Sequence, residues 1–471
     1  MPHFPVRNPL TSEVNTVTRA AKKIALCLGM TFALAISAGA QVKLPKLQFT
    51  DQTLDNGLRV IIAPDHSAPV FGISVTYNTG SRNEREGRTG FAHLFEHMMF
   101  QGSKNIAKGE HMLLVANNGG SMNGSTNNDQ TNYYEALPKN QLDLALFMEA
   151  DRMKALDVNQ ANLDNQRNAV QEERRLRVDN QPYGQSSEVL QSMAYDNFPY
   201  HHSVIGSMDD LNAAKLEDLQ EFFRIYYAPN NAVLVLAGDV DPVEALAKVK
   251  KHFGGIPRQP NPPPVDIVEP PHDKERRKTL TDGLARLPQF RAAFNVPSGN
   301  TSDNYALQVM SNIMSGGRSS RLFEKLVREK QLAANVNIFT EARRGPSLLH
   351  IVATPARGVK VEDLEAAIYA ELETLKKEGV TAKEIDKARS QYLRGQVQTR
   401  ASSLGLANRL ASNVIYFNDP NLINTSVDKY NAVTAEQVKA VAQKYLVPEQ
   451  RTVVITMPAG RGAASAPAAM Q

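Results

Sequence analysis

Residues 93–97 read His93-Leu94-Phe95-Glu96-His97, and this stretch decides how the rest of the chain is interpreted. Successive residues of an α-helix are about 100° apart, so His93, Glu96 and His97 fall on one face. The residues around these three are apolar: Phe91, Leu94, Phe95, Met98, Met99 and Phe100. A helix that is apolar nearly all round is predicted to be buried, and buried His and Glu side chains need partners. The alternative is a surface helix with a solvated Glu, but the flanking residues favour a metal site, with zinc as the first candidate.

The H-x-x-E-H order reverses the H-E-x-x-H pattern of many zinc peptidases, in which two His bind the metal and the Glu is the general base. A catalytic zinc usually has three protein ligands and one open position, so a third ligand is needed. Spacing alone leaves four candidates open: Glu135, Glu149, Glu172 and Glu173. The last two lie on a helix predicted over 163–177, which could instead be a charged surface helix with pairs such as Glu173 with Arg177. His350 is the only His after residue 275, so we expect one metal ion per chain.

The first 40 residues have the features of a secretory signal. Three basic residues (Arg19, Lys22 and Lys23) precede an apolar run of 13 residues over 24–36, and Ala38-Gly39-Ala40 is a typical small-residue cleavage site. The run is shorter than the roughly 20 apolar residues of a membrane span, and an uncleaved N-terminal anchor is the alternative. We therefore expect cleavage after Ala40, a periplasmic or secreted protein, and no stable membrane span in the mature chain.

Composition excludes several other classes of protein. The 471 residues are 42% hydrophobic and 22% charged, as is typical of a folded soluble protein with two or more domains. Without residues 1–40 the formal charge falls from +4 to about +1, which gives no basic patch for nucleic acid. The single cysteine, Cys27, lies inside the expected signal, so disulfides and thiol chemistry are excluded from the mature protein.

A proline-rich segment over 257–275 divides the chain. Its prolines disfavour helix and strand pairing, so it is predicted to be a semi-rigid, extended linker. It separates a first part, 41–256, which carries the metal motif, from a second part, 276–458, which lacks it. Residues 459–471 are expected to form a disordered tail. Both parts mix short apolar strands, such as 70–77, with helices predicted over 140–156, 163–177, 303–314, 362–378 and 382–411.

The two parts contain a repeat. Three positions recur at an offset of 219 residues: Leu219 with Val438, Tyr226 with Tyr445, and Pro229 with Pro448. In both parts an apolar run follows, at 233–236 and at 453–455. Each set predicts an amphipathic helix, a proline turn and a buried strand. We therefore expect an α+β protein made of two duplicated halves.

The chain resembles the pitrilysin-type, inverted-zincin family of metallopeptidases over about residues 48–458, and within it the bacterial relatives of the mitochondrial processing peptidase. The segments that carry the resemblance are Gly90–Met98, Gly119–Thr126, Thr131–Tyr134, Arg167–Glu173, Ser315–Phe323 and Arg328–Lys330. The resemblance implies two related α/β-sandwich-like halves that form a clam-like cleft. It also implies that Glu173 is the third zinc ligand. Family members often have a supporting acidic residue seven positions earlier, where this chain has Gln166.

The resemblance also implies a reaction and a way of binding substrate. His93, His97 and Glu173 would hold Zn²⁺, and Glu96 would activate a zinc-bound water to hydrolyse a peptide bond. Asn123 and Gly124 match the family's edge strand, to which an extended peptide or unfolded segment adds. Tyr134 matches a tyrosine near the substrate. From the residues alone, Asn123 and Gly124 would read as a turn, and Tyr134 as part of a half-buried strand.

One departure from the family pattern concerns the second half. Active members resemble one another in an Arg and a Tyr, about seven residues apart, that reach the active site; Arg328 fits the Arg, but Asn335 stands at the Tyr position. We therefore expect a related, zinc-less partner subunit that supplies the pair, or else a homodimer; the alternative is that the chain acts with Asn335 in a reduced or altered role. Two other functions are possible: a non-catalytic or weakly active structural subunit of a processing-peptidase-like complex, and a metallohydrolase that acts on small amides.

Overall fold

The computed structural model describes residues 44–459. The expected signal at 1–40 and all but the first residue of the expected tail lie outside this range. The described residues from Leu47 onward belong to one compact unit. No helix within 44–459 is both long enough and apolar enough to cross a membrane.

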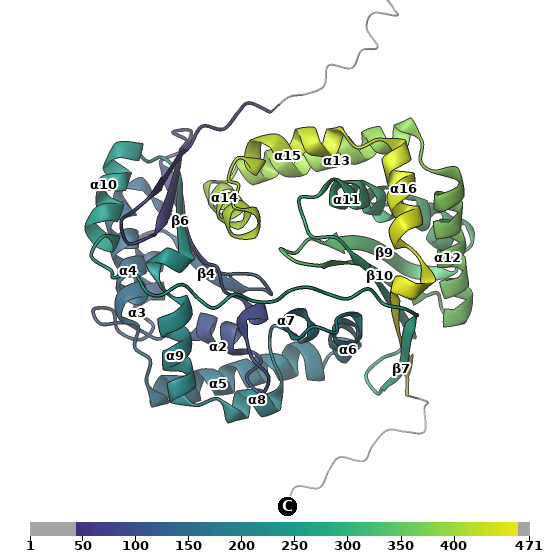
Figure 1. Cartoon of the computed structure of the whole chain (residues 1–471), viewed down its shortest axis with the longest axis horizontal. Helices are drawn as coiled ribbons and strands as arrows, with labels where there is room; N and C mark the ends of the chain where they lie inside the picture. Colours follow the sequence, from purple (N-terminus) through teal and green to yellow (C-terminus); the bar gives the residue numbers. More distant parts are fainter. Residues whose placement is uncertain (1–43, 460–471) are drawn as a thin grey trace, which may run out of the picture. The chain divides into compact units, whose positions relative to one another are not determined.

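The first half is built on a six-stranded sheet with the order β1-β2-β6-β3-β5-β4 (Figure 1). Its strands are β1 (Thr50–Thr53), β2 (Arg59–Pro64), β3 (Val70–Tyr77), β4 (Ser121–Thr126), β5 (Thr131–Pro138) and β6 (Ala232–Gly238). The expected strand 70–77 is confirmed at both ends. The central strands β3 and β6 are almost wholly buried because both faces of the sheet are covered, which explains the continuous apolar sequence of β6.

Helices of the first half surround this sheet and provide the metal motif. They are α2 (Phe91–Met98), α3 (Glu110–Asn117), α4 (Leu142–Ala155), α5 (Gln160–Arg174), α6 (Gly184–Ala194), α7 (Phe198–His201), α8 (Met208–Ala213), α9 (Leu216–Tyr226) and α10 (Pro242–Phe253). The apolar sides of α2, α4, α5, α9 and α10 join one face of the sheet in a single hydrophobic core. The helices expected at 140–156 and 163–177 correspond to α4 and to α5, which continues as a wider π-helical turn over Arg175–Asp179.

The second half repeats this architecture. Its five-stranded sheet has the order β7-β11-β8-β10-β9, with β7 (Arg276–Asp282), β8 (Gln289–Val296), β9 (Ala333–Glu341), β10 (Ser347–Pro355) and β11 (Arg451–Pro458). In both sheets the last strand of the half (β6 or β11) pairs parallel with the strand on one side (β2 or β7) and antiparallel with the strand on the other (β3 or β8). Helix α16 (Ala435–Tyr445) begins 219 residues after α9, and both helices lead through a proline turn into that strand. The duplication predicted from the sequence is confirmed.

The remaining helices are α11 (Ser302–Ser315), α12 (Val361–Glu378), α13 (Ala382–Arg400), α14 (Ser403–Phe417) and α15 (Leu422–Asn431), with a π-helical segment at Phe323–Glu329. The expectation of one helix over 382–411 is wrong. The chain breaks after Arg400, and Ser402 begins α14 by accepting a hydrogen bond from the backbone N–H of Gly405. Residues 257–275 contain neither helix nor strand.

Each half packs helices against the sheet of the other half, and the break before α14 permits this for α14. Helix α14 lies between the first sheet and α15 (Figure 1), and its apolar side packs on β2 and β6. Gly72 of β3 permits this approach, since a Cβ there would lie 2.7 Å from the backbone of Leu404. Conversely, α6 and α7 contribute Leu190 and Tyr200 to a cluster on the second sheet. This exchange was not predicted.

Candidate active site

The H-x-x-E-H motif lies on α2, whose first turn is fixed by its neighbours. Gly90, just before the helix, has φ +87°, and a Cβ there would lie 2.6 Å from the carbonyl oxygen of Ile205. The buried Glu84 carboxylate accepts hydrogen bonds from the backbone N–H groups of Gly90 (2.8 Å) and Ala92 (2.7 Å). A carboxylate at this end satisfies helix N–H groups that would otherwise lack partners. The rotation of α2, and so the direction of its polar face, is therefore well determined.

His93, His97 and Glu173 converge at this face. Their ligand atoms lie within 4.8 Å of one another. Oε2 of Glu173 is 3.2 Å from Nε2 of His97 and 3.6 Å from Nε2 of His93. A tetrahedral zinc with bonds of about 2.0–2.1 Å separates its ligand atoms by roughly 3.3–3.5 Å, so this donor set has the right spacing for a zinc ion.

Neighbouring groups prepare the imidazoles for a metal. Nδ1 of His97 lies 3.3 Å from Oε1 of Gln166, so this N–H can donate to the amide and leave Nε2 free as a ligand. Burial lowers the pKa of His93 to about 4, with His97 adding to the effect, and so favours the neutral ring that binds metals. Gln166 stands where the family often has an acid, and its amide oxygen can accept the same proton. Its role could not be read from spacing, because it depends on the rotation of α5.

Glu96 faces the edge strand β4. Its Oε2 accepts a 2.6 Å hydrogen bond from the Thr126 hydroxyl. A Cβ on Gly124 would lie 3.0 Å from Cγ of Glu96, so glycine makes room for the carboxylate. Burial raises the pKa of Glu96, and the Thr126 hydrogen bond opposes this shift. Thr126 ends the segment 119–126 that carries the family resemblance, but its contact with Glu96 was not predicted, because this contact depends on how β4 packs on α2.

The other candidate ligands lie elsewhere. Glu172 is exposed and pairs with Arg175 at 3.1 Å. Glu173 also pairs with Arg177 at 2.7 Å, but through Oε1, so its other oxygen still faces the two imidazoles. Glu135 and Glu149 belong to a separate buried group, described next.

That buried group combines His111, Glu135, Glu149 and Arg152. Nε2 of His111 is 2.6 Å from Oε1 of Glu135, while Arg152 forms a two-point ion pair with Glu149. Burial lowers the pKa of His111 to about 3 and raises that of Glu135 to about 7, which favours a neutral carboxyl donating to a neutral ring. Burial also raises the pKa of Glu149 to about 7, but the two contacts with Arg152 favour its ionised form. The group is then electrically neutral and needs no cation.

The predicted substrate residues lie along the free edge of the first sheet. Among residues 44–459, strand β4 pairs only with β5, and Asn123 is directly opposite Tyr134 in the register. Side chains alternate along a strand, so Asn123 and Tyr134 point to the opposite face from Gly124 and Tyr133. Asn123 is exposed and Tyr134 is half-buried.

Within residues 44–459, Arg328 makes no hydrogen bond or ion pair with the candidate metal site. It lies in the π-helical segment of the second half, 71% exposed, and pairs with Glu324 at 3.1 Å. Asn335 lies on β9, where it pairs with Thr354 of β10. Among the described residues, none of the recorded hydrogen bonds or ion pairs joins either side chain to α2 or Glu173.

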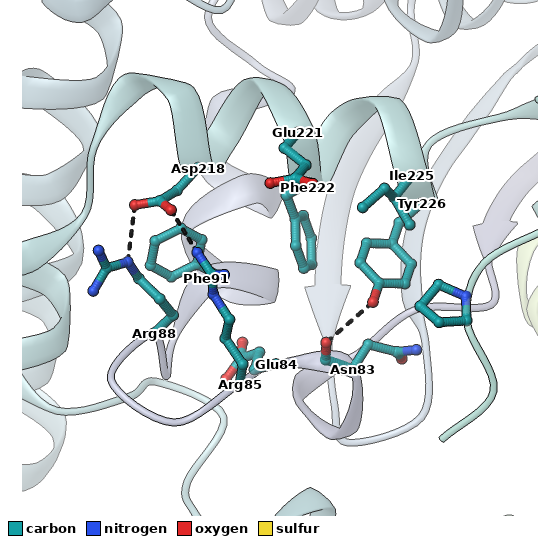
Figure 2. Close-up of a pocket in the computed structure, with 11 residues that line it drawn as sticks. Asn83, Glu84, Arg85, Arg88, Phe91, Asp218, Glu221, Phe222, Ile225 and Tyr226 are labelled. Atoms are coloured by element: carbon teal, nitrogen blue, oxygen red, sulfur yellow. Dashed lines mark hydrogen bonds and ion pairs between the residues drawn. The ribbon is translucent and has the colours of Figure 1, made fainter. Parts of the chain in front are cut away.

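A cavity of about 300 Å³ lies beside the start of α2 (Figure 2). Phe91, Phe222 and Tyr226 form its apolar wall, and Asp218 bridges Arg85 and Arg88 at its rim. None of His93, Glu96, His97 and Glu173 lines it. It is therefore separate from the candidate metal site.

Comparisons with known proteins identify the family of the chain. Residues 59–207 match the family model "Insulinase (Peptidase family M16)", and residues 213–392 match "Peptidase M16 inactive domain". The zinc protease PqqE of Helicobacter pylori is 31% identical over 438 residues, which cover 92% of this chain and 98% of the relative. A probable mitochondrial-processing peptidase subunit beta of Arabidopsis thaliana is 26% identical, with 84% and 75% covered. The crystal structure of a protease from Helicobacter pylori superimposes with a TM-score of 0.84 at 31% identity and covers 88% of this chain and 100% of that one. With a family model on each half and a relative of this similarity along nearly its whole length, the chain belongs to peptidase family M16.

Proposed function

We propose that the protein is a zinc-dependent endopeptidase with one catalytic zinc ion per chain, held by His93, His97 and Glu173. The observation that carries this proposal is the convergence of two Nε2 atoms on Oε2 of Glu173 at 3.2 and 3.6 Å. Curated relatives are named zinc proteases, which supports zinc as the metal. When bound, the ion would supply Lewis-acid chemistry, polarising the peptide carbonyl and acidifying water.

Glu96 is the proposed general base. It shares the polar face of α2 with His93 and His97, and its raised pKa suits proton exchange nearer neutral pH. The carboxylate would take a proton as water attacks the peptide carbonyl, and would later deliver it to the leaving amine. Thr126 holds one oxygen of Glu96, which leaves the other available for that proton.

The substrate is proposed to be an extended peptide or an unfolded protein segment. The free edge of β4 offers unpaired backbone N–H and C=O groups, and Gly124 brings this edge close to Glu96. A peptide added there as a further strand would place its backbone beside the general base. Asn123 and Tyr134, on the other face, would contact alternate side chains of the peptide.

Substitution of Glu96 tests the proposal most directly. Glu96→Gln should keep the catalytic zinc and lose hydrolysis of a mixed peptide library, whereas His93→Ala or His97→Ala should lose this zinc ion as well. Glu172→Gln is a matched control, because Glu172 is adjacent to the proposed ligand Glu173 but exposed. Peptide cleavage by Glu96→Gln at the parental rate would show that another group is the base.

Export and a partner subunit form part of the same proposal. We infer cleavage after Ala40 and a periplasmic or secreted location, which N-terminal sequencing of exported protein tests. A related zinc-less subunit would supply the Arg/Tyr pair that Arg328 and Asn335 do not form; the alternative is a homodimer, in which Asn335 stands in place of the Tyr. Sedimentation of the purified chain together with its activity tests this idea, since full proteolysis by a lone monomer would contradict it.

A further inference from the structure

A second group of potential metal ligands lies far along the sequence from α2. Asp196 follows α6, while Glu269 and His272 belong to the proline-rich segment 257–275. One ligand atom from each side chain lies within 4.8 Å of the other two. Imidazole nitrogens and carboxylate oxygens are both among the ligands that bind zinc in proteins.

His272 is the most informative of the three. The residue is only 4% exposed, and neither ring nitrogen has a hydrogen-bond partner that meets normal geometry among the described residues. Burial lowers the pKa of its ring and the Arg276 guanidinium adds to this shift, while the carboxylates of Asp196 and Asp273 and the carbonyl of Ala194 oppose it. A buried polar group without a partner is costly, and a bound ion is one of the few features that compensate for it.

The charge around His272 suits a divalent cation. Three carboxylates, from Asp196, Glu269 and Asp273, face one guanidinium, that of Arg276. The local charge is therefore close to −2. The Asp196 side chain is 50% exposed, so an ion could enter from solvent.

Both carboxylates are already oriented by other groups. The two oxygens of Glu269 accept the backbone N–H groups of Asp196 (2.7 Å) and Asn197 (3.1 Å). Arg276 holds Asp196 through two contacts of 2.6 and 2.7 Å. Each carboxylate oxygen keeps a further lone pair that can bind a metal ion. Hydrogen bonds like those from the backbone and from Arg276 commonly fix the orientation of metal ligands.

We propose that Asp196, Glu269 and His272 bind a divalent transition-metal ion, with Zn²⁺ the best match, and that this ion links the proline-rich segment to the end of α6. The segment is already held there, since the Asn197 side chain donates to the carbonyls of Asp266 and Val268. The neighbouring Tyr195 and Tyr200 pack on the second sheet. The ion would thus strengthen the attachment of first-half residues to the second half. This inference does not depend on peptidase activity.

Metal counting in defined variants tests the proposal. The background is the full chain with His93→Ala and His97→Ala, which removes the proposed catalytic site. After exposure to Zn²⁺ and desalting, mass spectrometry should find about one zinc per chain in this background and about none once His272→Ala is added. His66→Ala is the matched control. His66 pairs with Asp239 and belongs to none of the potential metal clusters of residues 44–459, so its loss should leave the zinc content unchanged.

Affinity and thermal unfolding complete the test. Competition with a chromophoric chelator should give a Kd for zinc below about 1 µM in the background. Loss of a group that only orients a ligand lowers metal affinity about 10- to 100-fold, so loss of the ligand itself in His272→Ala should raise the Kd by at least this factor. Zn²⁺ should raise the Tm of the background but not of the His272→Ala variant. If circular dichroism shows that His272→Ala is unfolded, Glu269→Gln takes its place. A background that retains no zinc, or a folded His272→Ala or Glu269→Gln variant that binds as tightly as the background, would overturn the proposal. Failure of the catalytic site would be seen separately, as a wild-type chain that holds no more zinc than the background.

Discussion

Replacing Thr126 with alanine tests whether the edge strand positions the general base. The Thr126 hydroxyl donates to Oε2 of Glu96 at 2.6 Å, and it is the only recorded side-chain donor to that carboxylate within residues 44–459. A hydrogen bond to a charged group contributes about 1.5–3 kcal/mol. Since 1.36 kcal/mol corresponds to a tenfold rate change, its complete loss from the transition state would lower kcat by about 13- to 160-fold.

We expect a loss at the lower end of this range, about 10- to 30-fold, because Thr126 also stabilises the Glu96 carboxylate in the resting enzyme. KM should change by less than about threefold, since the hydroxyl points at Glu96 and not at the free edge of β4. The measurement is steady-state cleavage of an internally quenched peptide, with zinc content determined on the same samples.

Two further variants separate positioning from a general effect on the strand. Thr126→Ser keeps the hydroxyl and should stay within about threefold of wild type in kcat. Ser125→Ala changes the exposed neighbour on the same strand and should have little effect. The reasoning is refuted if Thr126→Ala matches Thr126→Ser in kcat, or if Ser125→Ala loses as much activity as Thr126→Ala.

Three other predictions concern metal binding, pH and packing. Gln166→Leu removes the acceptor for Nδ1 of His97 and should weaken zinc binding about 10- to 100-fold, measured by chelator competition. The folded-state pKa of Glu135 is about 7 against 4.5 normally, so its stabilising effect is complete below pH 4.5 and disappears as the pH rises through 7. Glu135→Gln mimics the neutral acid, so its free energy of unfolding should rise relative to wild type by up to about 1.4 kcal/mol per pH unit between pH 4.5 and 7. Glu149→Gln leaves Arg152 buried without its partner and should lower the free energy of unfolding by about 3–5 kcal/mol. Urea unfolding across this pH range measures both effects. Gly72→Ala places a methyl group 2.7 Å from the backbone of Leu404 and should cost about 1–3 kcal/mol by thermal unfolding, and an unchanged Tm would show that α14 does not pack closely on β3.

The sequence predicted those parts of the site that depend on local geometry. Three residues spaced i, i+3 and i+4 must share a helical face, so the grouping of His93, Glu96 and His97 followed from spacing alone. Glu173 did not, because its approach to that face depends on how α5 packs on α2. Four acidic residues remained possible until a family resemblance favoured Glu173, and the structure brings this one to the two imidazoles. The repeat could be predicted because a helix, a proline turn and a strand each depend on neighbouring residues in the sequence.

The exchanged helices were missed because no strong signal marks the break before α14. Residues 400–403 contain neither proline nor glycine, and the Ser402 cap is a common sequence feature. Whether a helix covers its own sheet or its neighbour's depends on contacts between distant residues, which periodicity does not reveal. Gly72 is the residue most directly tied to the exchange, and its sequence context resembles any other strand glycine.

The exchange gives the half without a metal motif a direct connection to the candidate active site. Helix α14 binds the turn and strand that follow β4: Tyr416 donates to Asn127 at 3.2 Å, Gln130 to Ser412 at 3.1 Å, and Asn132 to Asn408 at 3.1 Å. These contacts begin one residue after Thr126, the partner of Glu96. The second half thus contacts the first directly beside β4, the strand proposed both to receive the peptide and to orient the base. A half that contributes no metal ligand can in this way still be required for the reaction, because β4 must be correctly placed before a bound peptide can lie beside Glu96.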